Sequence, residues 1–206
     1  MLLLIIPTNE SGKAVDLETS TTENTIEEAI ITFKRACKRL LTPAVWQKLS
    51  GLASASFHIA PDRNDKPERL LILNDYVMID IPGPGPAAGN GYDWVQVKKI
   101  WKNAVPQSDE SLCITLRAAS NPHKPAQGTA HFFEHTATST FIIKRNNTTV
   151  TASYYRRNEK PNTTAVNLPD KIRNKLIAKG ALAGFSEIQW TALIKGFLEK
   201  RLADDL

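Results

Sequence analysis

The sequence has no long apolar run and no basic leader. The apolar stretch at its start, Leu2 to Ile6, is shorter than the roughly 7–15 residues of a signal-peptide core, and no basic residue precedes it. No segment approaches the ~20 apolar residues that a membrane-spanning helix needs. A chain of 206 residues, of which 42% are hydrophobic, can instead bury a core of its own. We therefore expect a single soluble domain over residues 1–206, located in the cytoplasm and away from membranes.

Cysteine is scarce, and short catalytic signatures are missing. Cys37 and Cys113 are the two cysteines, and no C-x-x-C spacing is present, so cysteine-based zinc and redox motifs are excluded. We expect both to be buried free thiols, the usual state of an unpaired cysteine. The sequence also contains neither a G-x-S-x-G nucleophile elbow nor a G-x-G-x-x-G loop. These absences favour a protein that binds rather than catalyses, and no cofactor is expected.

The clearest pattern that is present lies in residues 138–157. Two β-rich runs flank Asn146-Asn147, which predicts a β-hairpin with a tight two-residue turn. The register that places Arg145 opposite Thr148 gives this hairpin one apolar face. The residues on that face are Ser139, Phe141, Ile143, Val150, Ala152 and Tyr154. A half-buried antiparallel pair has this division between an apolar and a polar face.

Alternating apolar and polar residues predict further strands of the same sheet. The ranges with this pattern are 53–59, 69–73, 76–81, 92–101 and 112–118. With the hairpin they make about seven strands in series, whose edges need closure or cover. We therefore predict a curved or barrel-like antiparallel sheet over residues 52–158.

Helical patterns flank the sheet region at both ends. A capping box at Thr25 predicts a helix over residues 26–41, and a short second helix would end at Gly51. After the sheet, one helix is predicted over residues 169–180, and a capping box at Ser186 begins the last helix. That last helix is apolar around much of its circumference, which indicates burial.

These elements define an α+β fold class. An N-terminal helical segment (residues 1–51) and two C-terminal helices (residues 159–206) are expected to pack on the curved or barrel-like antiparallel sheet. Gly196 lies inside the apolar last helix and indicates close packing against the sheet or against a second subunit. A homo-oligomer formed through this helix is therefore one expectation.

One five-residue motif matches a metalloprotease signature. His131-Phe132-Phe133-Glu134-His135 has the letters of H-x-x-E-H, in which two histidines bind zinc and the glutamate acts as general base. On a helix the two histidines lie ~6 Å apart and can share an ion, whereas on a strand they lie about 13 Å apart. β-favouring residues surround the motif and lead into the hairpin. We therefore expect a strand here, with a metal-dependent hydrolase as an alternative function.

An uncharged loop rich in glycine and proline, residues 82–91, has aromatic and acidic neighbours. Its prolines remove backbone N–H donors, so it is a poor phosphate-binding loop. Asp80 and Asp93 lie at its two ends and could act as acid and base, but no partner base or nucleophile is identifiable. The protein is therefore expected to bind a small apolar ligand or a partner protein, in or on the sheet. The candidate walls of the pocket are Tyr92, Asp93, Trp94 and Trp101.

The net charge of +5 is concentrated in the C-terminal part. Residues 144–201 contain 12 Lys and Arg against 4 Asp and Glu, whereas residues 1–143 contain 14 against 15. Such asymmetry permits an anionic partner, and exposed tyrosine and arginine on a sheet can stack on bases and neutralise phosphates. The second alternative is therefore nucleic-acid or polyanion binding, through Lys144, Tyr155, Arg157, Lys171, Arg173 and Lys175.

Overall fold

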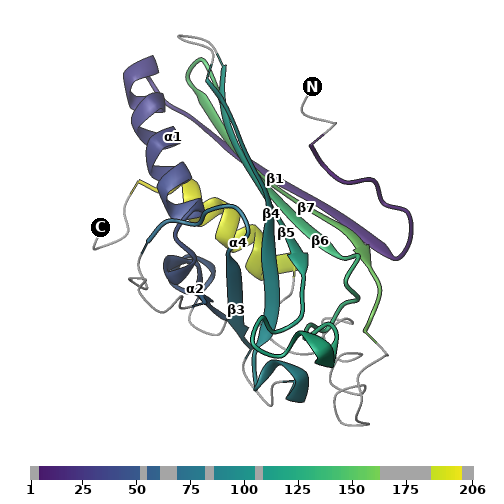
Figure 1. Cartoon of the computed structure of the whole chain (residues 1–206). Helices are drawn as coiled ribbons and strands as arrows, with labels where there is room; N and C mark the ends of the chain where they lie inside the picture. The colour runs from purple at the N-terminus through teal and green to yellow at the C-terminus, as the bar shows by residue number, and fades with distance from the viewer. Residues whose placement is uncertain are drawn as a thin grey trace.

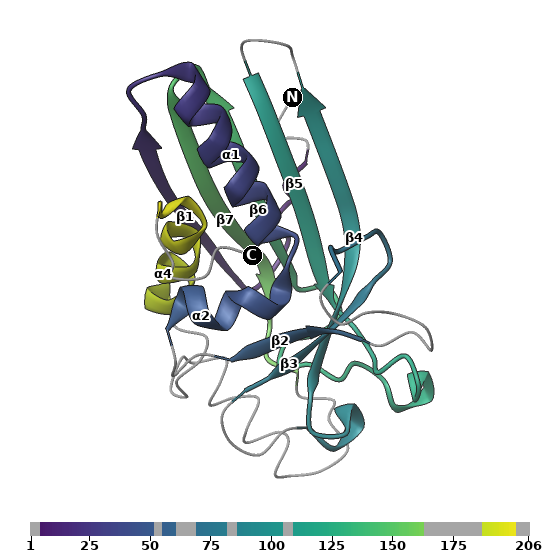
Figure 2. The same ribbon diagram turned by 90° about the vertical axis from the view of Figure 1, so that its left-hand side faces the viewer.

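The fold is a twisted antiparallel sheet with helices on one of its faces. The structure is a computed structural model and describes residues 5–51, 55–60, 69–81, 86–104, 109–162 and 187–200. Figures 1 and 2 show the helices together on one side of the long strands, and the N-terminal arm, residues 5–12, on the other. Within the described residues, no helix has the length and apolar character needed to cross a membrane.

Seven strands form one sheet, and every neighbouring pair is antiparallel. The strands are β1 (Lys13–Thr22), β2 (Ser56–Ile59), β3 (Tyr76–Asp80), β4 (Asp93–Ala104), β5 (Asp109–Ala118), β6 (Thr138–Asn146) and β7 (Thr149–Glu159). Their order is β1-β7-β6-β5-β4-β3-β2, so β1 and β2 are the two edges. The predicted α+β class with about seven antiparallel strands is confirmed, and the sheet is open rather than closed into a barrel.

The N-terminal helices lie where the sequence predicts them. α1 (Ile26–Leu40) begins after the N-cap Thr25, whose hydroxyl accepts the Glu28 N–H at 3.2 Å. A 3-10 turn (Pro43–Val45) leads into α2 (Trp46–Ser50), which ends at Gly51 with φ +102°. The buried stripe of α1 contains Ala29, Phe33, Ala36 and Leu40.

The last described helix, α4 (Glu187–Leu198), packs against β1, β7 and α2. A Cβ on Gly196 would lie 2.9 Å from the Leu49 Cβ, so the glycine allows α4 to approach α2 closely. The buried residues of α4 include Trp190, Leu193, Ile194, Phe197 and Leu198. The helix predicted over residues 169–180 lies outside the described residues, and the homo-oligomer stays a prediction.

Strand β1 corrects the prediction that residues 1–51 form a helical segment. It pairs with β7 along its whole length, so the first described strand lies beside the last described one. Its alternation is weak, because Val15 and Leu17 are its only large apolar residues and a run of Thr and Ser follows them. Pairing with β7 stabilises this strand, because the backbone groups at the β7 edge would otherwise be unpaired in the hairpin alone.

Residues 69–73 are a second correction, because they form a loop and not a strand. The Asp75 carboxylate accepts the Ile72 N–H at 2.8 Å and so bends the chain just before β3. Leu71 is buried, and its N–H donates to the Leu41 carbonyl at 2.8 Å, below the end of α1. Leu70, Ile72 and Leu73 are exposed, and no strand among the described residues pairs with this run.

The β6–β7 hairpin has the predicted faces in a register shifted by two residues. Arg145 lies opposite Val150 and not opposite Thr148, and the turn residues are Asn147 and Thr148. Side chains alternate with a period of two, so a shift of two leaves every residue on its predicted face. Phe141, Ile143, Val150, Ala152 and Tyr154 are all buried there.

The sheet buries side chains on both faces, but to different extents. The helix face packs against the helices and forms the main core; it includes Val97, Leu112, Ile114, Phe141, Ile143 and Tyr154. The arm face is covered in part by the N-terminal arm; it includes Trp101, Cys113, Thr115, Ile142 and Tyr155. On the arm face Ile5 packs with Cys113 and Ile142 in a small cluster.

Both cysteines are free thiols, as predicted. Cys113 is buried and Cys37 is partly buried. Burial raises the pKa of the Cys113 thiol to about 11 and that of Cys37 to about 12, so neither is a reactive thiolate at neutral pH.

Candidate functional site

A cavity of about 30 Å³ lies between the helix face and the helices α2 and α4. Its walls come from α2, α4 and the six strands β2 to β7, together with the segment before β6. They include Trp46 of α2, Phe57 of β2, Phe141 of β6, Tyr154 of β7 and Trp190 of α4. One water molecule needs ~10–15 Å³ by this measure, so the cavity has room for about two.

Aromatic rings form one wall of the cavity. Tyr154 stacks with Trp190 and with Phe141, with 4.5 Å between ring centroids in each pair. Trp46 lies 5.2 Å from Phe57 and 5.2 Å from Phe141. Rings at these separations attract one another through dispersion and their quadrupoles. The wall is therefore apolar and closely packed.

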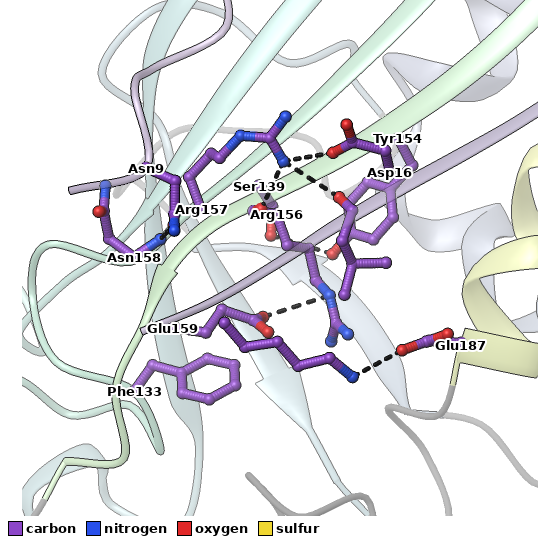
Figure 3. A network of polar contacts seen from close by, with 12 residues as sticks. Asn9, Asp16, Phe133, Ser139, Tyr154, Arg156, Arg157, Asn158, Glu159 and Glu187 are labelled. Carbon is purple, nitrogen blue, oxygen red and sulfur yellow. Dashed lines mark hydrogen bonds and ion pairs between the residues drawn. The ribbon is translucent and has the colours of Figure 1, made fainter. Parts of the chain in front are cut away.

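The cavity also has a polar, buried lining (Figure 3). Arg156 and Glu159, 7% and 8% exposed, form an ion pair with 3.3 Å between Arg156 Nε and Glu159 Oε1. The Arg156 Nε makes no hydrogen bond within the described part of the chain. Burial raises the pKa of Glu159 to about 7, against the opposing effects of Arg156 and Lys13. The Ser139 and Tyr154 hydroxyls, 3.0 Å apart, line the same cavity, and burial raises the pKa of Tyr154.

Two sets of contacts hold α4 beside the cavity. Near its N-terminal end, Lys13 Nζ and Glu187 Oε1 form an exposed ion pair at 2.7 Å. Near its C-terminal end, the buried Arg39 guanidinium donates to the carbonyls of Gly196 at 2.9 Å and Glu199 at 2.6 Å. A cation is favourable at the C-terminal end of a helix. The buried hydrogen bonds of Arg39 are therefore expected to hold α4 more strongly than the exposed Lys13–Glu187 ion pair does.

The two histidines of the H-x-x-E-H motif line different hollows. His131 is buried at the interior cavity, where its Nδ1 accepts the Phe133 N–H at 3.0 Å and its ring stacks on Phe132 at 4.1 Å. His135 is exposed and lines a groove on the arm face. The fold therefore separates the two imidazoles that a shared zinc ion would need.

The strand predicted before Thr138 is not formed, and neither is a helix. The Ala137 N–H donates to the Glu134 carbonyl at 3.0 Å and closes a turn, and the preceding segment has an isolated bridge between Phe133 and Pro161. The helical geometry in which histidines four apart bind one ion is therefore absent from this motif. In the part of the chain that the structure describes, no group of three His, Cys, Asp or Glu side chains could hold a metal ion.

The aromatic residues predicted to line a ligand pocket are not brought together. Trp94 is 3% exposed, and its Nε1–H donates to the Gly89 carbonyl at 3.0 Å, which anchors the end of the glycine- and proline-rich loop. Trp101 lies further along β4 and packs against the small cluster on the arm face. Tyr92 is partly exposed just before β4. Residues 82–85 of the loop lie outside the described residues.

The two aspartates at the loop ends lie on opposite faces of the sheet. Asp93 is fully buried and lies opposite Ile79, so it shares the face of that residue. Asp80 follows Ile79 in β3 and is exposed on the other face. They therefore do not form the paired carboxylates of an acid–base site.

Three of the six residues predicted to bind nucleic acid lie on the arm face. They are Lys144, Tyr155 and Arg157. Arg157 is paired with the Asp16 carboxylate of β1, and its guanidinium lies 5.6 Å from the centroid of the Tyr155 ring. Lys171, Arg173 and Lys175 lie outside the described residues. Nucleic-acid binding through these six residues stays a prediction.

Sequence reasoning missed Arg156 and Glu159. In the predicted register Arg156 continues the apolar face of Tyr154. A charged residue on a buried face needs a partner, so this position could have indicated a buried polar site. Glu159 could not be found in this way, since alternation places it on the other face. Asn158 has φ +60°, and this left-handed residue interrupts the alternation so that Glu159 meets Arg156.

Comparison with known proteins gives structural similarity at low sequence identity. No family model and no curated protein match the chain. A hypothetical protein of Helicobacter pylori is 10% identical, with a TM-score of 0.49 over 92% of this chain and 88% of its own. A protein of Mycobacterium smegmatis is 11% identical, with a TM-score of 0.39 over 94% and 93%. The major latex-like protein 151 of Panax ginseng is 12% identical, with a TM-score of 0.32 over 82% and 94%.

Proposed function

We propose that the protein binds a small, largely apolar ligand with one carboxylate in the cavity between the helix face and α4. One observation carries this proposal: an aromatic wall and a buried guanidinium with an unused donor, Arg156 Nε, line the same cavity. Ligand sites combine mostly apolar walls with a few polar groups that fix orientation. The ring system of the ligand would lie against Tyr154 and Trp190, and its carboxylate at Arg156.

The ligand carboxylate would take the place of Glu159 at Arg156. Burial raises the pKa of Glu159 to about 7, so the ionised side chain is disfavoured here relative to water. An ordinary carboxylic acid has a pKa near 4 to 5 and is still ionised at pH 6. At that pH Glu159 is mostly neutral, and the ligand supplies the missing anion. Affinity for an acid is therefore expected to rise as the pH falls from 8 to 6.

The cavity must widen before a ligand enters, and Trp190 is the side chain placed to move. It lies in the first turn of α4, at the end held by the exposed Lys13–Glu187 pair. The other end is held by the buried bonds of Arg39. An outward movement of the first turn would withdraw the indole ring and add its volume to the cavity.

Calorimetric titration with 1-naphthaleneacetate and with uncharged 1-ethylnaphthalene tests this proposal. The acid is expected to bind more tightly at pH 6 than at pH 8. Arg156→Gln should reduce its affinity at least about tenfold, the effect of one charge-assisted hydrogen bond, and should change binding of the uncharged compound little. Trp190→Ala should improve binding of both compounds, because it enlarges the apolar space.

Arg145→Gln is the matched control. Arg145 is also a buried arginine of the β6–β7 hairpin, paired with Glu110 at 2.8 Å, but it does not line the cavity. Its removal should leave binding of the acid unchanged in protein that remains folded by circular dichroism. Equal losses from both arginine variants, or no binding of either compound to the wild type at millimolar concentration, would contradict the proposal.

A further inference from the structure

A second hollow lies on the arm face, and it differs from the interior cavity in size and in charge. It is an open groove of about 580 Å³ between the N-terminal arm, strands β4 and β5, and the segment before β6. Small-molecule sites have volumes of ~300–1,000 Å³. Residues with polar side chains that line it include Glu10, Lys98, Lys99, Arg117, His135 and Thr138.

Three cations line this groove without an ion-pair partner. Lys98, Lys99 and Arg117 are exposed, and none of them is paired with a carboxylate among the residues that the structure describes. Arg157, on the same face of the sheet, is instead neutralised by Asp16. The positive charge of the groove is therefore available to a partner.

A β-bulge brings the two lysines into the same groove. Consecutive residues of a regular strand point to opposite faces. The register of β4 on β5 shifts between Val97, opposite Leu116, and Lys99, opposite Thr115, so that Lys98 is an extra residue. Bulges re-aim side chains and are frequent beside binding sites. Because of this one, Lys98 and Lys99 both line the groove.

The arm that forms the opposite wall is fixed by Asn158. Its Oδ1 accepts the Glu10 N–H at 2.8 Å, and its own N–H donates to Asn9 Oδ1 at 2.8 Å. Gly12, with φ +79°, lets the arm pass close to β7, because a Cβ there would lie 2.6 Å from the Glu159 carbonyl oxygen. The wall is therefore preformed, which lowers the entropic cost of binding.

A threonine of β6 lies beside the cations. Thr138 is opposite Arg117 in the β5–β6 ladder, and both residues line the groove. The Thr138 hydroxyl has no hydrogen-bond partner within the described residues. Its oxygen is buried and Thr138 also lines the interior cavity, so the three cations, and not this hydroxyl, are the groups that can contact an anion in the groove.

We propose that this groove binds the phosphate of a small phosphorylated molecule, a phosphomonoester or a diphosphate. The planar Arg117 guanidinium matches two phosphate oxygens, and the two lysines act as point charges beside it. Among the described residues that line the groove, Glu10 is the one carboxylate against three cations, which leaves a surplus that a dianion neutralises and a monocarboxylate does not. The site differs from the interior cavity, because its three cations lie on the other face of the sheet, although Thr138 lines both hollows.

Calorimetric titration with inorganic pyrophosphate at low salt tests this inference. The wild type should bind it, with an affinity that falls as salt rises. The triple variant K98Q/K99Q/R117Q should lose at least about a hundredfold in affinity, since each lost charge-assisted contact is worth roughly tenfold or more. Glu10→Gln should increase affinity about threefold, because it removes a like charge from the wall.

The matched control is K34Q/K102Q/K195Q, which removes the same charge from three exposed lysines outside the groove. It should keep nearly all of the affinity, and thermal unfolding should show that both triple variants are folded. Equal losses in the two triple variants, or no binding of pyrophosphate below 5 mM, would overturn the inference. If a single-stranded oligonucleotide binds through the same three residues more tightly than pyrophosphate does, the inference is overturned and the groove is a nucleic-acid site. Binding of 1-naphthaleneacetate should be unaffected by either triple variant.

Discussion

The two faces of the sheet differ in how tightly they are packed and in the hollows that they border. The helix face packs aromatic rings against three helices and leaves a cavity of about 30 Å³. The arm face has a cluster of few apolar residues and an open groove of about 580 Å³ lined by cations and threonines. Stability should therefore depend mainly on the first face, whereas the second can change its surface residues at little cost to folding. The same seven strands thus border a small interior cavity and a large open groove.

Neighbouring residues of β6 give the sharpest test of this division. Phe141 lies on the helix face among Trp46, Tyr154 and Trp190, and Ile142 lies on the arm face beside Ile5. Phe141→Ala should lower the free energy of unfolding by about 4 kcal/mol, and Ile142→Ala by about 2 kcal/mol. Urea denaturation of both variants measures the difference. Equal losses would show that the arm face carries as much of the core as the helix face.

The next largest effect is a pH dependence that Glu159, at the interior cavity of the helix face, contributes to stability. The pKa of Glu159 is raised from 4.5 to about 7 by burial, so the folded protein binds this proton more tightly than the unfolded chain. Its contribution is fully present below pH 4.5, is lost as the pH rises through 7, and amounts to at most about 3 kcal/mol. Glu159→Gln should remove this slope from urea denaturation curves recorded between pH 5 and 8. Glu110→Gln should leave this pH dependence in place. If the pH dependence persists in Glu159→Gln, another group is responsible for it.

The smallest effect is expected at the edge of the arm face. Asp16 is largely exposed and pairs with the less exposed Arg157. Asp16→Asn should lower the free energy of unfolding by no more than about 1 kcal/mol, the usual value of a surface ion pair. It also releases one cation near the groove, so pyrophosphate affinity should rise about twofold. A larger loss of stability would mean that this pair holds β1 in the sheet.

Much of the sheet could be predicted because alternation is a local signal. The faces of Phe141, Ile143 and Tyr154 were predicted correctly although the register was wrong by two, since such a shift conserves the face. β1 was missed because Val15 and Leu17 give too short an alternation to distinguish a strand from a polar segment. Its place beside β7 depends on pairing across more than a hundred residues, which no local pattern contains.

The sites were less predictable than the fold, because non-local packing builds them. The interior cavity needs Trp46, Phe141 and Trp190 from three distant elements to meet, and no local sequence pattern shows that they do. The groove depends on the bulge at Lys98, which the sequence of β4 does not reveal. Tyr92 and Trp101 illustrate the converse, since nearness in sequence did not bring them into one pocket.

Gly12 has a consequence for tracing this architecture among distant chains. Any larger residue there would collide with the Glu159 carbonyl, so an arm that crosses β7 at this point requires glycine before its first strand. Proteins of similar fold can therefore be divided by whether they have glycine at the position equivalent to Gly12. Those with a glycine at the equivalent place, followed some eighty to ninety residues later by adjacent lysines, would be the ones to screen first for phosphorylated metabolites.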